Sequence, residues 1–226
     1  MSARSNFGSP RVATSVLFGD LAVLGREVRA AVRAGADWVH VDVMDDSPVR
    51  SVRPAVPRGR AVLDVHLLVR PTDALVRAVA RAGADLVTFH PEESDCVRRT
   101  LGLVKGLGCR VGLALSASTP LGEIEDLLGE LDAVVVTSLG SGPGDAGALA
   151  RIRAASDRVS TAGRRIVLEV DGGVRPGNLE ALIRAGADVL VACPAFLGPR
   201  ECAAALAALE DPRTRRTPGA AAGGLA

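Results

Sequence analysis

Short apolar, valine-rich segments alternate with amphipathic segments along almost the whole chain. Such alternation is typical of strands that pair in parallel and are covered by helices. We expect strands at residues 12–18, 38–44, 62–69, 86–90, 110–116, 133–139, 166–170 and 189–192, and helices at 21–34, 72–82, 96–107, 121–128, 145–162, 178–185 and 201–209. An irregular loop follows the second strand. Eight units of this kind in 226 residues predict an α/β chain folded as a single-domain (β/α)8 TIM barrel.

One pentapeptide, Arg-Ala-Gly-Ala-Asp, occurs at residues 33–37, 81–85 and 184–188. Each copy stands between an expected helix and an expected strand. Glycine at this place ends a helix in a left-handed turn, so that the strand follows at once. The alternative, an open doubly wound sheet, favours Gly-x-Gly-x-x-Gly after its first strand. The sequence there is Gly19-Asp20-Leu21, which favours the barrel.

Composition indicates the domain bounds, the classes of partner and the cellular location to expect. We expect an N-terminal extension at 1–11, the barrel at 12–211 and a disordered tail at 212–226, which is rich in Arg, Gly and Ala. The net charge is +1 and aromatic residues make up 2%, with no tyrosine, so neither nucleic acid nor a membrane surface is indicated as a partner. The cysteines have no paired or metal-type spacing and residues 1–10 lack the apolar run of a signal peptide, so we expect a cytoplasmic protein.

Ionisable residues gather at the ends of three expected strands, in His40-Val41-Asp42, Asp64-Val65-His66 and Glu169-Val170-Asp171. Alternate residues of a strand share a face, so the imidazole and carboxylate of each segment point the same way. In one barrel these groups converge at the carboxyl end of the strands, where barrel enzymes carry their active sites. Two imidazoles among carboxylates suit a divalent metal flanked by acid/base groups. The sequence therefore predicts an enzyme.

Longer stretches around these segments carry a resemblance. They are residues 34–45, which end in His-Val-Asp-Val-Met-Asp, then Asp64-Val65-His66-Leu67, Thr119-Pro120-Leu121 and residues 169–174. Together they resemble the ribulose-phosphate 3-epimerases over residues 15–198. The resemblance implies an isomerase that removes a proton beside a ketose carbonyl and returns one on the opposite face. The implied small-molecule substrate is a sugar or sugar phosphate.

The resemblance also implies roles for individual residues. The ligands of one divalent ion (Zn, Fe, Mn or Co) would be His40, Asp42, His66 and Asp171, with Asp42 and Asp171 as the two proton-transfer groups. The substrate contacts would be Ser15, Met44, Gly142, Gly144, Gly172 and Gly173. Because Asp64 precedes His66 by two residues, we expect its carboxylate to orient that imidazole.

The segments that would grip a phosphate depart from the family pattern. The loop at 140–147 is glycine-rich but lacks the family's aromatic residue and contains Asp145, and Cys193-Pro194 replaces the family's Gly-Ser. Proline has no N–H to donate, and a carboxylate repels phosphate. The interpretation is retained proton-transfer chemistry on an altered substrate of a specialised pathway.

Two other functions remain as alternatives. A decarboxylase or aldolase barrel places a lysine in its mouth, whereas the one lysine, Lys105, lies on an expected outer helix. A barrel that has lost turnover and binds a ligand or partner would have no reason to keep stoichiometric metal. Apolar outer helices such as 203–209 are compatible with a homo-oligomer and equally with burial against the barrel.

Overall fold

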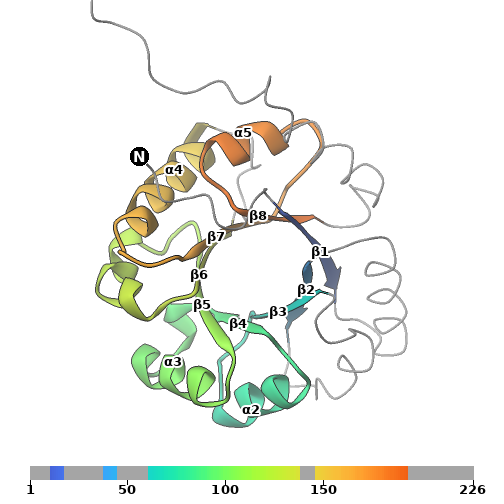
Figure 1. Ribbon diagram of the computed structural model, residues 1–226, viewed down its shortest axis with the longest axis vertical. Coiled ribbons are helices and arrows are strands. Elements are labelled where there is room, and N and C mark those ends of the chain that lie inside the picture. Colours follow the sequence, from blue (N-terminus) through green and yellow to red (C-terminus); the bar gives the residue numbers. More distant parts are fainter. Residues whose placement is uncertain (1–10, 18–37, 45–60, 138–145, 193–226) are drawn as a thin grey trace, which may run out of the picture.

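Eight parallel strands close into a barrel in the computed structural model, which describes residues 11–17, 38–44, 61–137 and 146–192 (Figure 1). The strands follow one another round the ring in sequence order, and β8 pairs with β1. They are β1 (Arg11–Leu17), β2 (Trp38–Val43), β3 (Val62–Leu67), β4 (Leu86–Phe89), β5 (Arg110–Leu115), β6 (Ala133–Thr137), β7 (Val167–Asp171) and β8 (Val189–Ala192). The predicted barrel class is confirmed.

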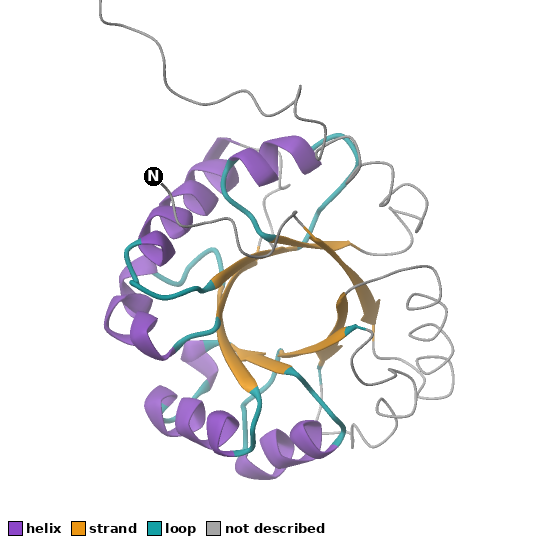
Figure 2. Ribbon diagram, in the orientation of Figure 1, coloured by secondary structure: helices purple, strands orange, loops and turns teal. Residues whose placement is uncertain are grey.

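Helices cover the outside of this ring, as Figure 2 shows. They are α2 (Asp73–Arg81), α3 (Val97–Gly106), α4 (Ala146–Ser160) and α5 (Leu179–Arg184), with the 3-10 segments η1 (Pro91–Glu93) and η2 (Leu121–Glu130). Among the described helices, none is both long and apolar enough to cross a membrane. The helices predicted at 21–34 and 201–209 lie outside the described residues.

Most predicted bounds differ from the structure by one or two residues, as where the strand predicted at 62–69 ends at Leu67, and two differences have a clear physical reason. The segment at 121–128 was expected to be an α-helix and is part of the 3-10 segment η2, in which Gly122 and Gly129 lower the helix propensity. The strand expected at 86–90 ends at Phe89, because Pro91 has no N–H for the ladder and begins η1 instead. His90 therefore lies between β4 and η1, as the residue that directly precedes the 3-10 segment.

The barrel interior changes from apolar to polar along the strands. At the amino ends, inward-facing Trp38, Leu86, Ala133, Val167 and Val189 form a buried cluster. Two residues further along β2, β4 and β7, the corresponding positions carry the buried polar side chains of His40, Thr88 and Glu169. The apolar layer excludes water from below, so that the polar groups above it interact in a low-dielectric environment.

The Arg-Ala-Gly-Ala-Asp repeat has a double structural role. Gly83 and Gly186 adopt φ angles of 95° and 110°, the left-handed region that ends a helix. The aspartate that follows ties neighbouring strands together. Asp85, before β4, accepts a hydrogen bond from the backbone N–H of Leu63 in β3 at 2.8 Å. Before β8, Asp188 accepts one from Leu168 in β7 at 2.9 Å. In these two copies the repeat thus supports both the turn and the strand pairing, and the copy at 33–37 lies outside the described residues.

Candidate metal centre

Four side chains from three strands meet at the carboxyl end of the barrel. One nitrogen each of His40 and His66 and one oxygen each of Asp42 and Asp171 lie within 4.8 Å of one another. Parallel register brings Asp42 of β2 beside His66 of β3, whereas Asp171 reaches in from β7. The structure therefore brings together the four residues expected to bind a metal.

The two imidazoles present different ring nitrogens to the carboxylates. Nε2 of His40 lies 3.2 Å from Oδ1 of Asp42 and 4.0 Å from Oδ2 of Asp171. In His66 it is Nδ1 that lies 3.3 Å from Asp42 and 3.6 Å from Asp171. The side chains of Asp42 and Asp171 keep 10% and 18% exposure, whereas both imidazoles are fully buried. The cluster thus opens to solvent on its carboxylate side.

Asp64 does not orient His66, as the sequence led us to expect. Its Oδ2 accepts a hydrogen bond from Nδ1 of His40 at 2.7 Å. Oε1 of Glu169 lies 3.2 Å from the same nitrogen, and both carboxylates are fully buried. His66 is contacted through Nε2 by His90, at 3.1 Å. Register explains the error, since Asp64 pairs with His40 on the neighbouring strand.

These contacts set the charge on the buried groups. Burial alone would lower the pKa of His40, but Asp64, Asp42 and Glu169 together raise it well above its ordinary value. Burial would raise the pKa of Asp42, yet the His40 hydrogen bond and the His66 imidazole hold it well below its usual range. Burial, reinforced by the negative charge of Asp64, raises the pKa of Glu169 to about 8. Burial thus favours the protonated form of Glu169.

The donor set fits a divalent transition metal. Two imidazole nitrogens with two carboxylate oxygens are ligands that Zn²⁺ and Fe²⁺ accept. Nδ1 of His66 is buried and makes no hydrogen bond to any described residue, although both carboxylates face it. A metal ion would supply the missing partner for that nitrogen. The cluster is thus able to hold a divalent ion, whose identity the donor set leaves open.

Of the six residues expected to contact substrate, the structure describes four, and these differ in burial. Ser15 is buried on β1 and pairs with His40 in the sheet register. Gly172 and Gly173, directly after Asp171, adopt φ angles of 98° and 63°, which orient their backbone in a way other residues rarely allow. Met44 follows β2 and is 53% exposed. Gly142 and Gly144 lie outside the described residues.

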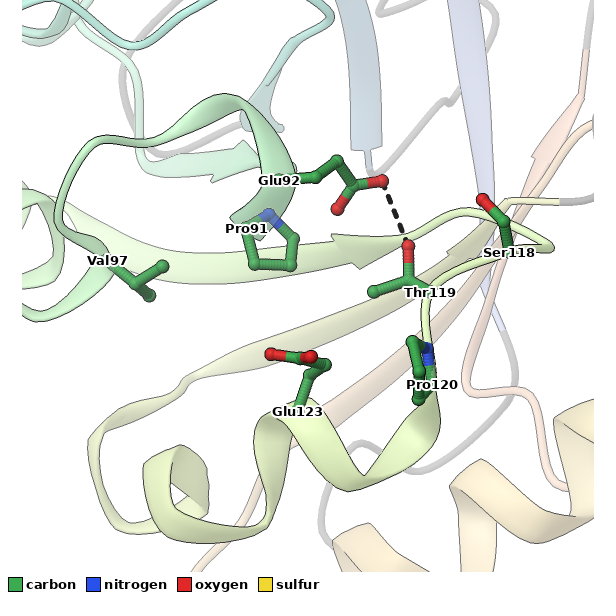
Figure 3. A pocket seen from close by; sticks show the side chains of 7 residues that line it. All are labelled: Pro91, Glu92, Val97, Ser118, Thr119, Pro120 and Glu123. Atoms are coloured by element: carbon green, nitrogen blue, oxygen red, sulfur yellow. Dashed lines mark hydrogen bonds between the residues drawn. The ribbon is translucent and has the colours of Figure 1, made fainter.

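A separate cavity of about 290 Å³ lies between the segments that follow β4 and β5 (Figure 3). Its lining consists of Pro91, Glu92, Val97, Ser118, Thr119, Pro120 and Glu123. Glu92 accepts a hydrogen bond from Oγ1 of Thr119 at 2.9 Å and lies 3.5 Å from Nδ1 of His90. Sequence reasoning gave Glu92 no role, because only the turn after β4 brings it near His90.

Comparisons with known proteins agree with this geometry. The model of the Ribulose-phosphate 3 epimerase family matches residues 11–197. The chain is 43% identical over 203 residues to ribulose-phosphate 3-epimerase 1 of Cupriavidus necator, with 83% of this chain and 84% of that protein covered. It is 40% identical over 193 residues to ribulose-phosphate 3-epimerase of Escherichia coli strain K12, with 80% and 86% covered.

Solved structures share the fold at low sequence identity. The 3-keto-L-gulonate-6-phosphate decarboxylase of Vibrio cholerae superposes with a TM-score of 0.68 at 16% identity, covering 90% of this chain and 98% of that one. The structure of KGPDC from Streptococcus mutans gives a TM-score of 0.68 at 12% identity, covering 92% and 100%. At such low sequence identities the similarity shows a shared barrel fold and nothing about function.

Proposed function

Because the chain belongs to the ribulose-phosphate 3-epimerase family and is a carbohydrate epimerase, we propose that it inverts C3 of ribulose 5-phosphate. One observation carries the proposal. Asp42 of β2 and Asp171 of β7 come from strands that β1 and β8 separate in the ring, yet both carboxylates reach the same two imidazoles. A ketose bound between them meets one carboxylate on each face.

Two carboxylates so placed perform a two-proton inversion. One carboxylate, ionised, takes the proton from C3, and the electron pair of the C–H bond passes into the enediolate. The other, protonated, donates its proton to C3 from the opposite face and becomes ionised. The two carboxylates have then exchanged protonation states, and the reverse reaction starts from the product. Because one group acts as a base and the other as an acid, only one of Asp42 and Asp171 is ionised at a time.

The metal ligands in this proposal are Nε2 of His40, Nδ1 of His66, and one carboxylate oxygen each of Asp42 and Asp171. When bound, a divalent ion polarises the ketose carbonyl and offsets the negative charge of the enediolate. Ser15 contacts the substrate from β1. The N–H groups of Gly172 and Gly173, in their left-handed turn, form part of the phosphate site.

A second candidate substrate is an unphosphorylated or otherwise modified ketose. The observation that favours it is the sequence of the other phosphate-binding segments, where Asp145 adds a carboxylate and Pro194 removes an N–H donor. Both residues lie outside the described part of the structure. The same two carboxylates would carry out the inversion.

Proton exchange followed by NMR in D2O tests both candidates. Protein loaded with Zn²⁺, Mn²⁺ or Fe²⁺ is offered ribulose 5-phosphate and, separately, ribulose. We expect exchange at C3 of ribulose 5-phosphate, slowed by about 10²–10⁴-fold in Asp42→Asn and Asp171→Asn. The matched control is Asp73→Asn, which changes an exposed carboxylate paired with Arg99 and leaves the rate unchanged.

Each other outcome has a clear meaning. Exchange confined to ribulose supports the second candidate and rejects the phosphate. Metal bound at one ion per chain without exchange of either ketose contradicts both substrates. Failure to bind metal at all contradicts the proposed centre and favours a barrel without turnover.

A further inference from the structure

His90 is a third imidazole that touches the cluster without facing the carboxylates. Its Nε2 lies 3.1 Å from Nε2 of His66, and the two rings are 5.0 Å apart with an angle of 28° between their planes. His90 is buried, and it follows β4 directly, on the side of His66 away from His40. His90 therefore lies where a hydrogen bond to Nε2 of His66 can fix the orientation of that ring.

The partners of the three groups fix where their protons lie. A carboxylate only accepts, so Oε1 of Glu92, 3.5 Å away, favours the proton of His90 on Nδ1. Nε2 of His90 then has a lone pair and accepts from the Nε2–H of His66. With its proton on Nε2, His66 keeps a lone pair on Nδ1, the nitrogen that faces Asp42 and Asp171.

Glu92 is itself held in place by the segment that follows β5. Its Oε1 accepts from Oγ1 of Thr119 at 2.9 Å, the contact drawn in Figure 3. Thr119 also bonds the hydroxyl of Ser116 at 2.6 Å. Arg151 of α4 donates to the backbone carbonyls of both Ser116 and Thr119 at 2.6 Å. A chain of contacts thus runs from α4 to the metal-facing imidazole.

We propose that His90, held by Glu92, is a positioning residue that fixes the tautomer and the ring orientation of His66 for metal binding. The inference rests on the proposed metal centre and adds the residue that prepares one of its ligands. His40 has the equivalent support from Asp64, so each imidazole ligand is held by its own partner on the ring nitrogen that does not bind metal. Loss of such a partner lowers metal affinity by about 10–100-fold.

The test measures the Kd for Zn²⁺ of metal-free protein in competition with a chromophoric chelator. His90→Leu removes the acceptor and keeps a buried apolar side chain, whereas His90→Gln offers a carbonyl oxygen near the position of Nε2. We expect His90→Leu to weaken Zn²⁺ binding by about 10–100-fold and His90→Gln to recover most of the loss. Circular dichroism confirms that both variants are folded.

A Kd for His90→Leu within about twofold of the wild-type Kd overturns the proposal, because the expected loss of affinity is about 10–100-fold. Equal losses in the Leu and Gln variants overturn it too, because they indicate packing rather than a hydrogen bond. Should His90→Leu not fold, Glu92→Ala is compared with Glu123→Ala, which lines the same cavity. Weaker binding in Glu92→Ala alone supports the proposal, and equal affinities overturn it. Wild-type protein that binds no Zn²⁺ contradicts the proposed metal centre itself.

Discussion

Asp64 accepts a hydrogen bond from Nδ1 of His40 at 2.7 Å, with both side chains fully buried. The bond leaves Nε2 of the same ring as the nitrogen that faces Asp42 and Asp171. A divalent ion held at Nε2 would place positive charge on the imidazole, which the buried carboxylate of Asp64 would stabilise. Asp64 therefore supports the proposed centre although it contributes no ligand atom.

Replacing Asp64 with asparagine tests this support. Asparagine keeps an oxygen that accepts from His40 but removes the negative charge, so we expect Zn²⁺ affinity to fall by about 10-fold or more and kcat/KM to fall with it. Competition titration gives the affinity, and steady-state epimerisation gives kcat/KM. Asp73→Asn is the control at an exposed ion pair. An unchanged affinity in Asp64→Asn would show that the charge of Asp64 is not needed.

Metal removal is expected to lower thermal stability. An ion that binds the folded chain alone stabilises it by about 2.7 kcal/mol at a free concentration of 100 Kd. For a chain of this length that corresponds to a rise in Tm of roughly 5–10 °C. Calorimetry of metal-free protein with and without Zn²⁺ measures the shift, and Asp171→Asn should lose most of it. An equal shift in wild type and Asp171→Asn would place the bound ion elsewhere.

Much of the barrel was predictable because its signals are local. Alternating apolar segments and the repeated Arg-Ala-Gly-Ala-Asp each report on a few neighbouring residues, and the structure shows why. Gly83 ends a helix and Asp85 ties the next strand to its neighbour. The shared faces of the three polar segments also followed from the two-residue period of a strand.

Contacts across strands were less predictable. The register of β2 and β3, which no local pattern of the sequence gives, sets Asp64 directly beside His40. Asp64 therefore finds its partner in His40 across the sheet rather than in His66 on its own strand. The role of His90 depends on the turn begun by Pro91, which no periodicity reveals.

Close packing inside the barrel gives a prediction at Gly112. A Cβ added there would lie 2.7 Å from Oγ1 of the buried Thr88 and 3.1 Å from Cβ of Ala133. Because neither neighbour can move freely in the barrel, Gly112→Ala should destabilise the fold by about 1–3 kcal/mol. Gly102 in α3 has nothing within 4 Å, so Gly102→Ala should stabilise it by about 0.5–1 kcal/mol. Urea unfolding compares the two, and equal effects would mean that the barrel relaxes around the added methyl group.

Cys109 should resist alkylation while Cys96 reacts. Cys109 is buried and donates to the carbonyl of Ala84 at 3.2 Å, whereas Cys96 is exposed at the start of α3. Burial, and then the charge of Asp85, raise the pKa of the Cys109 thiol. A smaller fraction of Cys109 than of an ordinary thiol is therefore the reactive thiolate at pH 8. Iodoacetamide at pH 8 followed by peptide mapping in a Cys193→Ser, Cys202→Ser background measures the two sites separately. We expect Cys96 to be modified first and Cys109 only after urea unfolds the chain. Comparable rates in the native protein would show that the chain opens readily near the start of β5, because the closed barrel shields this thiol from the reagent.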